Sequence, residues 1–225
     1  MSERAVAVVA GATGLVGRAL VRQLAADGAW REVRALTRRD LPPGLAGPGV
    51  VPVQVDYSRL EPPPTWAAAE HVFCALGTTM RQAGSREAFR RVDFDYPVAL
   101  ARATLARGAR HFLLVSAVGA SPDSRFFYNR VKGEVEAAIA GLGFRSVTIA
   151  RPSLLLGDRG TFRWAEQVGR VAGIVAPARW RPVSADRVAR ALIAAAGRDE
   201  PGVRILENPE LRTAAAHKRA MESSW

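Results

Sequence analysis

The sequence predicts one α/β domain with a doubly wound, mainly parallel sheet. Short apolar runs typical of buried strands alternate along the chain with segments of helical periodicity, which is the order of elements in a parallel sheet. A glycine-rich turn also joins the first such run directly to the first helix. At 225 residues, the chain is long enough for one such domain. We assign all of it, 1–225, to this domain, with 153–182 as a small elaboration on the substrate side.

The first half of the chain begins with a strand at 5–10, whose sequence is AVAVVA. Apolar residues then recur at helical spacing until Gly28, which predicts a helix. We expect further strands at 33–37, 50–55 and 71–76, separated by stretches rich in proline and glycine. A helix capped by Ser85 and running through Val92 follows, and a separate helix is predicted over 96–107, with Pro97 in its first turn.

The second half continues the same alternation. Strands are expected at 111–116, 146–150 and 203–206, and helices at 125–140 and 185–196, the latter capped by Ser184. After the strand at 146–150 we expect an irregular segment over 157–182, with a short helix near 162–171. After the last strand we expect a polar tail.

Composition excludes several classes of protein. The only cysteine, Cys74, rules out an intrachain disulfide, and we expect it to be an inert buried thiol. His71, His111 and His217 lack metal-ligand spacing, so no metal site is predicted. His71 and His111 open strands and are expected to be surface or cap residues. No run of about 18 apolar residues predicts a membrane span. We expect a cytoplasmic protein.

The net charge of +11 raises the question of a nucleic-acid partner. Only two of the basic residues are lysines, and the arginines are spread along the chain without the clusters and interleaved aromatic residues of known binding modules. We therefore expect no nucleic-acid role.

The glycine-rich turn carries the first functional signal. Gly11 allows a tight turn, Gly14 lets a pyrophosphate approach the backbone, and Gly17 lets the helix pack closely. The start of the helix adds free N–H groups for phosphate. The turn therefore predicts a dinucleotide site formed by Gly11, Thr13, Gly14, Leu15, Val16 and Gly17.

The end of the second strand predicts which dinucleotide binds. Enzymes that bind the free ribose 2′-hydroxyl place an acidic residue here, whereas this chain has Arg38 and Arg39. Guanidinium groups suit a 2′-phosphate, so we expect NADP(H) in preference to NAD(H). Asp56 follows the third strand, where it either contacts the adenine or caps a turn.

Tyr128 and Lys132 lie four residues apart on a predicted helix and therefore share one face. A tyrosine ordinarily titrates near pH 10, and a neighbouring ammonium group favours its phenolate, which suits acid–base catalysis. Ser116, at the end of the preceding strand, is placed to donate a hydrogen bond to a substrate carbonyl. Ser121 and Ser124 are alternatives in the following loop.

These motifs resemble the short-chain dehydrogenase/reductase superfamily. The stretch from Cys74-Ala75-Leu76-Gly77-Thr78-Thr79 through Val92-Asp93, His111-Phe112 and Ser116 to Tyr128-x-x-x-Lys132-Gly133-Glu134-Val135-Glu136 and Arg151-Pro152 looks more narrowly like its atypical Tat-interacting-protein-like (CC3-like) members. The resemblance implies a Rossmann fold, bound NADPH and a catalytic Ser116-Tyr128-Lys132 site. It also implies cofactor contacts from Leu76, Gly77, Thr78, Lys132 and Pro152. The asparagine that completes the site of typical members has no placed equivalent.

The resulting hypothesis is an NADPH-dependent oxidoreductase acting on a small carbonyl or apolar compound. Two alternatives stay open: a cofactor-binding regulatory protein with little turnover, and an epimerase or dehydratase that retains its nicotinamide. Phe162, Trp164, Ile174 and Trp180 either line the substrate pocket, pack in the core or form a dimer surface. A homodimer or a protein partner is compatible with each reading.

Overall fold

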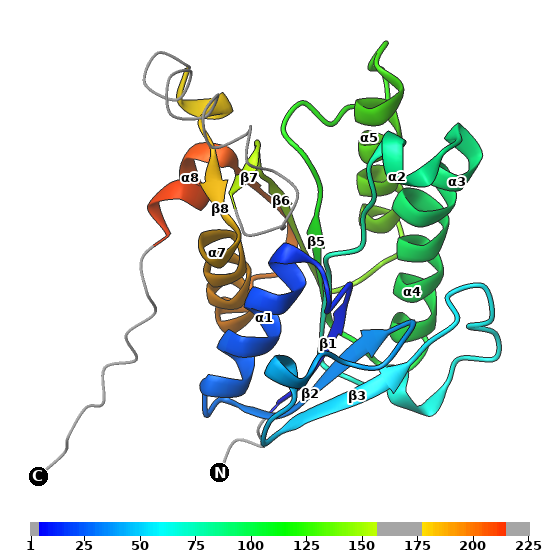
Figure 1. Cartoon of the computed structure of the whole chain (residues 1–225), viewed down its shortest axis with the longest axis vertical. Helices are drawn as coiled ribbons and strands as arrows, with labels where there is room; N and C mark the ends of the chain where they lie inside the picture. Colours follow the sequence, from blue (N-terminus) through cyan, green and yellow to red (C-terminus); the bar gives the residue numbers. More distant parts are fainter. Residues whose placement is uncertain (1–4, 157–176, 215–225) are drawn as a thin grey trace, which may run out of the picture.

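The chain folds around a seven-stranded sheet in which all neighbouring strands are parallel (Figure 1). The computed structural model describes residues 5–156 and 177–214. The strand order is β3-β2-β1-β4-β5-β6-β9, so the order reverses between β1 and β4. The strands are β1 (Ala5–Ala10), β2 (Trp30–Thr37), β3 (Val50–Gln54), β4 (His71–Cys74), β5 (His111–Val115), β6 (Ser146–Arg151) and β9 (Gly202–Glu207).

Helices cover both faces of this sheet, which confirms the predicted doubly wound Rossmann fold (Figure 1). On one face lie α1 (Leu15–Ala26) and α7 (Ala185–Arg198), and on the other α4 (Tyr96–Leu105) and α5 (Phe127–Ala140). Because side chains alternate along a strand, Val9 packs in the core beneath α1 while Val8 packs beneath α4 and α5. Two apolar layers therefore hold the sheet between the helices.

The helical segment before β5 differs from the prediction of two separate helices. Here α3 (Arg86–Arg90), a π-helical turn η3 (Arg91–Asp95) and α4 follow without a break, since the residues at both junctions keep right-handed helical angles. Ser85 caps the run as expected, with its hydroxyl accepting a hydrogen bond from the Ala88 N–H. Pro97 is therefore inside a continuous helical run, immediately after the widened π turn.

The end of the chain is more ordered than the predicted polar tail. After β9, α8 (Asn208–Thr213) lies beside the short parallel pair β7 (Leu155–Leu156) and β8 (Val183–Ser184). Ser184 caps α7, as predicted. The helix expected near 162–171 lies outside the described residues. The remaining short elements are η1 (Pro43–Leu45), η2 (Thr65–Ala67), α2 (Met80–Ala83) and η4 (Ala178–Trp180).

Asn208 is buried and ties both ends of the predicted elaboration to α8. Its Oδ1 accepts a hydrogen bond from the Ser153 N–H at 3.0 Å, and its Nδ2 donates to the Arg181 carbonyl at 2.8 Å. The Ser153 hydroxyl also donates to that carbonyl, at 2.5 Å. The two stretches that lead into and out of 157–176 are thereby fixed at the carboxyl end of the sheet.

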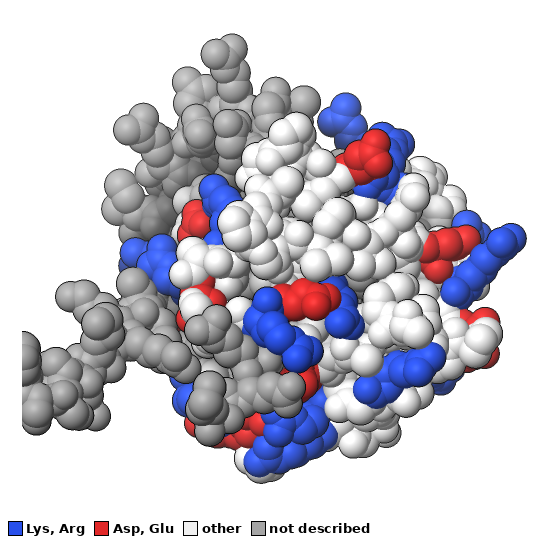
Figure 2. All heavy atoms as spheres, turned by 90° about the horizontal axis from the view of Figure 1, so that it is seen from below, with Lys and Arg blue, Asp and Glu red and all other residues white. Residues whose placement is uncertain are grey.

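The described surface carries charges of both signs. Figure 2 shows basic and acidic side chains interspersed, with uncharged surface between them, on the end of the molecule where β1 begins. Within residues 5–156 and 177–214, no helix is long and apolar enough to cross a membrane.

Candidate functional site

The glycine-rich turn joins β1 to α1 at the carboxyl end of the sheet. Gly11 has φ +76°, and a Cβ there would lie 2.5 Å from the Ala75 carbonyl oxygen. A Cβ on Gly17 would lie 2.0 Å from the Gly11 oxygen, so close packing requires glycine at both positions. Gly14 is the N-cap of α1, and its φ of −77° is open to any residue. A Cβ there would meet only the Gly11 oxygen, at 3.3 Å, so glycine at this position leaves room above the turn.

A cleft lies above this turn, where the strand order reverses between β1 and β4. It holds about 150 Å³ of space for water-sized spheres, and about 620 Å³ when its open mouth is counted. Side chains do not cap the first N–H groups of α1, so they are available to an anion. The cleft is lined by residues from the ends of four strands and from the π turn: Gly11, Thr13, Gly14, Leu36, Thr37, Arg38, Tyr57, Ala75, Leu76, Gly77, Val92 and Tyr96.

The two arginines at the end of β2 are not equivalent. Arg38 lines the cleft with an exposed side chain, whereas Arg39 is exposed and is not among the lining residues. Asp56 lies in a turn, where its Oδ1 accepts hydrogen bonds from the Ser58 hydroxyl at 2.6 Å and the Ser58 N–H at 3.0 Å. These two bonds lower the pKa of Asp56, and its carboxylate serves as the turn cap.

Other predicted cofactor residues contribute mainly backbone. The Val16 side chain is buried in the core beneath α1, and half-buried Leu15 packs against it, so each can reach a ligand only through its N–H group. The Thr78 N–H is already taken, because it donates to Asp93 Oδ2 at 2.8 Å. Pro152 is buried, and its carbonyl accepts a hydrogen bond from the Val118 N–H at 2.9 Å.

Lys132 is a buried cation beside this cleft, behind Gly77. Its Nζ lies 2.7 Å from Asp93 Oδ1, and both side chains are almost completely shielded from solvent. A Cβ placed on Gly77 would lie 3.4 Å from that Asp93 oxygen and 3.7 Å from the Lys132 nitrogen, so the ion pair borders the cleft directly. Burial alone lowers the pKa of Lys132, but Asp93 and the Tyr128 hydroxyl raise it by more. The ammonium group is therefore charged.

Tyr128 lies one turn before Lys132 on α5, so the two side chains share a face. It is 37% exposed, and its ring packs at 5.5 Å from that of Phe89. α5 itself is held close to the preceding loop by Gly133, where a Cβ would lie 2.1 Å from the Ser121 backbone. Only glycine permits this approach, which sets the position of Tyr128 relative to the loop after β5.

Ser116 follows β5 with a buried hydroxyl that has no hydrogen-bond partner among the described residues. A buried hydroxyl without a partner is costly in a folded protein and is typical of a group reserved for a ligand. The alternatives are both used locally: the Ser121 hydroxyl accepts from the Asp123 N–H and the Ser124 hydroxyl from the Phe126 N–H. Ser116 is thus the serine left available.

Asp93 is the site residue that the sequence did not identify. The predicted helix ended at Val92, whereas the continuous run carries Asp93 into the π turn, where its side chain is fully buried. π turns occur often at functional sites, since the extra residue redirects a side chain. The sequence contained only indirect signals for it. A lysine that is buried in the fold needs a carboxylate beside it, because an unpaired buried charge is strongly destabilising. Asp93 was also part of the motif that carries the family resemblance.

Cys74 is buried in β4 as expected, and burial raises the pKa of its thiol to about 12, which rules out a reactive thiolate. The expectation of surface histidines is wrong for His71 and His111. They are 6% and 1% exposed, because they open two central strands that are covered on both faces.

Comparisons with known proteins agree with this geometry. Residues 11–199 match the NAD(P)H-binding family. The chain is 36% identical over 214 residues to Protein FMP52, mitochondrial, of Eremothecium gossypii, covering 91% of this chain and 95% of that one. It is 37% identical over 164 residues to Protein HTATIP2 of Rattus norvegicus, covering 72% of this chain and 67% of that one.

Among solved structures, MoeE5 in complex with UDP-glucuronic acid and NAD superimposes with a TM-score of 0.70 at 20% identity, covering 89% of this chain and 75% of that chain. Identity at this level shows a shared fold alone. The sequence comparison also corrects one expectation. The prediction of a cytoplasmic protein is overturned, because the FMP52 relatives are named as mitochondrial proteins. By its matched region and its relatives, the chain belongs to the NAD(P)H-binding Rossmann family, among the atypical short-chain dehydrogenases/reductases that its motifs resemble.

Proposed function

We propose that this protein is an NADP(H)-dependent oxidoreductase that reduces the carbonyl group of a small, mainly apolar compound. The observation that carries the proposal is the arrangement along α5. Tyr128 lies one turn from Lys132, whose ammonium group is fixed by buried Asp93 beside Gly77 of the cleft. A charged lysine held beside the cleft is poised to stabilise a phenolate one turn away.

The cleft has the features that a dinucleotide requires. The uncapped start of α1 and the glycine at position 14 offer N–H groups and space to a pyrophosphate. Tyr57, Leu76 and Val92 provide apolar walls for the rings. Lys132 borders the cleft at Gly77, where it would hold the nicotinamide ribose. A bound reduced nicotinamide would supply the hydride for the carbonyl carbon.

Two side chains act on the substrate oxygen in this proposal, and two more support them. The Ser116 hydroxyl, free of other partners among the described residues, donates a hydrogen bond to it and orients the carbonyl. Tyr128 gives its hydroxyl proton to the oxygen as negative charge develops there, and the product is an alcohol. The Lys132 ammonium group stabilises the phenolate that remains, and Asp93 keeps Lys132 in place.

The preference for NADP(H) rests on Arg38. Its exposed guanidinium group lies at the cleft edge after β2, where the 2′-phosphate of the adenosine ribose would lie. Arg39 is outside the lining, so we assign it no direct contact. A charge-assisted contact of about 1.5–3 kcal/mol corresponds to a preference of roughly 10- to 150-fold over NAD(H).

The test measures oxidation of NADPH with a panel of small aldehydes, ketones and quinones. Tyr128→Phe removes only the hydroxyl and should reduce turnover by about 10²-fold or more at unchanged NADPH affinity. Turnover equal to wild type in this variant would remove Tyr128 from the mechanism. Product formation without net NADPH consumption would instead indicate a nicotinamide-retaining enzyme, and binding without turnover on any substrate a regulatory role.

A further inference from the structure

A second cluster of buried polar groups lies at the opposite end of the sheet from the cleft. His71 opens β4 and His111 opens β5, and parallel pairing sets these two residues directly opposite each other. Their ring centroids are 5.7 Å apart. Asp199, the residue that ends α7, brings its carboxylate to the same place with a left-handed backbone, φ +44°. Three segments distant in sequence thus meet at one point.

The spacing of these groups suits a metal ion. One ring nitrogen of each histidine and one Asp199 oxygen all lie within 4.8 Å of one another. His111 Nδ1 is 3.5 Å from Asp199 Oδ1. A tetrahedral ion with bonds of about 2.1 Å separates its ligand atoms by about 3.4 Å. That edge of the polyhedron is therefore already formed, and the remaining ligand atom, on His71, has to come closer to the other two by up to about 1.4 Å.

The histidines also lack other partners for these nitrogens. Nδ1 of His71 and Nδ1 of His111 are both buried without a hydrogen bond to any described residue. An unpaired buried polar atom is costly in a folded protein, so two of them beside one carboxylate are unusual.

The surroundings hold two of the groups in place. The Thr148 hydroxyl lies 2.9 Å from His111 Nε2, the kind of outer contact that orients a ligand histidine. Arg145 binds Asp199 Oδ2 at 2.8 Å and Arg110 approaches it at 3.9 Å, while Oδ1 is turned toward His111 and accepts a hydrogen bond from the Ser146 hydroxyl at 3.2 Å. These two guanidinium groups also repel a cation, so we expect a moderate affinity.

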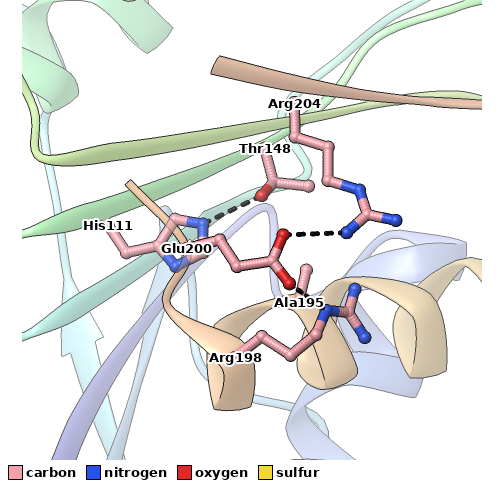
Figure 3. A pocket seen from close by; sticks show the side chains of 6 residues that line it. All are labelled: His111, Thr148, Ala195, Arg198, Glu200 and Arg204. Atoms are coloured by element: carbon pink, nitrogen blue, oxygen red, sulfur yellow. Dashed lines mark hydrogen bonds and ion pairs between the residues drawn. The ribbon is translucent and has the colours of Figure 1, made fainter. Parts of the chain in front are cut away.

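We propose that His71, His111 and Asp199 form a binding site for a divalent late first-row metal ion, with Zn²⁺ as its representative. Two imidazoles and one carboxylate are a ligand set that such ions favour, and the set leaves one position for water. A small pocket at the surface is lined by His111 and Thr148 (Figure 3). Its Glu200 carboxylate lies between Arg198 and Arg204, which neutralise it, so this neighbouring carboxylate does not compete for the ion.

The experiment uses the full chain without a histidine tag, stripped of metal and free of nucleotide. Zn²⁺ is titrated in competition with a chromogenic chelator, and we expect one ion per chain. His71→Gln and His111→Gln should each weaken binding by about tenfold or more, and Thr148→Val by a smaller factor. His217→Gln is the matched control, since it removes the remaining imidazole of the chain, and it should bind as wild type does.

Arg110→Gln gives a test with the opposite sign. It removes a positive charge near Asp199 and no ligand, so Zn²⁺ should bind several-fold more tightly. If a histidine variant does not fold, the visible spectrum of Co²⁺ on the wild-type protein decides. Bands of four- or five-coordinate Co²⁺ support the site, and the spectrum of the hydrated ion overturns it. Absence of stoichiometric Zn²⁺ binding, or binding unchanged in both histidine variants, would also overturn the assignment.

Discussion

Replacing Asp93 by asparagine should destabilise the protein far more than the same replacement of a surface aspartate, because Asp93 neutralises the buried Lys132 ammonium group. Asp93→Asn leaves the Lys132 ammonium group buried without its counter-charge, where the ion-pair distance is 2.7 Å and the Asp93 side chain is 0% exposed. Removing one partner of such a pair costs about 3–5 kcal/mol of unfolding free energy. For a domain of this size, each kcal/mol lowers Tm by about 2–4 °C, so Tm should fall by about 6–20 °C.

The assay is urea unfolding of a double-mutant cycle with Lys132→Met, which removes the charge and keeps the length of the side chain. The double variant should recover much of the loss, because no unpaired charge is left. Asp95→Asn is the matched control: the same change two residues away in the same π turn, at an exposed position, should stay within about 0.5 kcal/mol of wild type. Equal effects at both positions, or additive effects of Asp93 and Lys132, would refute the reasoning.

Three further variants test the cleft and its surroundings. Gly14→Val should abolish NADPH binding at unchanged Tm in calorimetry and thermal unfolding, whereas Gly17→Ala should lower Tm because its Cβ would lie 2.0 Å from the turn carbonyl. Arg38→Ala should lose most of the preference for NADPH over NADH, measured as the ratio of their Kd values, and Arg39→Ala should lose little of it. Equal Kd values of the wild-type protein for the two cofactors would contradict the assignment. Asn208→Ala should lower Tm and raise the substrate KM with the NADPH Kd unchanged, since it releases the backbone on both sides of 157–176. If the NADPH Kd rose as well, the Asn208→Ala substitution would be acting on the whole fold and not on the substrate side alone.

The order of strands and helices and the glycine turn were predictable from the sequence. These features depend on local periodicity and on the conformational demands of single positions. Buried central strands such as β1 are continuous apolar runs, and the helix after them repeats its apolar residues every three to four positions. The spacing of Tyr128 and Lys132 is similarly local, because four residues make about one helical turn. Each of these signals lies within a short stretch of chain.

The partners of those residues were decided by the tertiary structure. Asp93 lies 39 positions before Lys132 in the sequence, and the two meet because Asp93 is buried in the π turn and α5 packs against that turn. His71 meets His111 only because β4 and β5 pair in register, and Asp199 joins them only where α7 ends. Burial then forces charged and polar groups to find partners, whatever their distance in sequence. The sequence therefore determined which chemical groups the chain carries and on which elements, and the packing of those elements determined which groups act together.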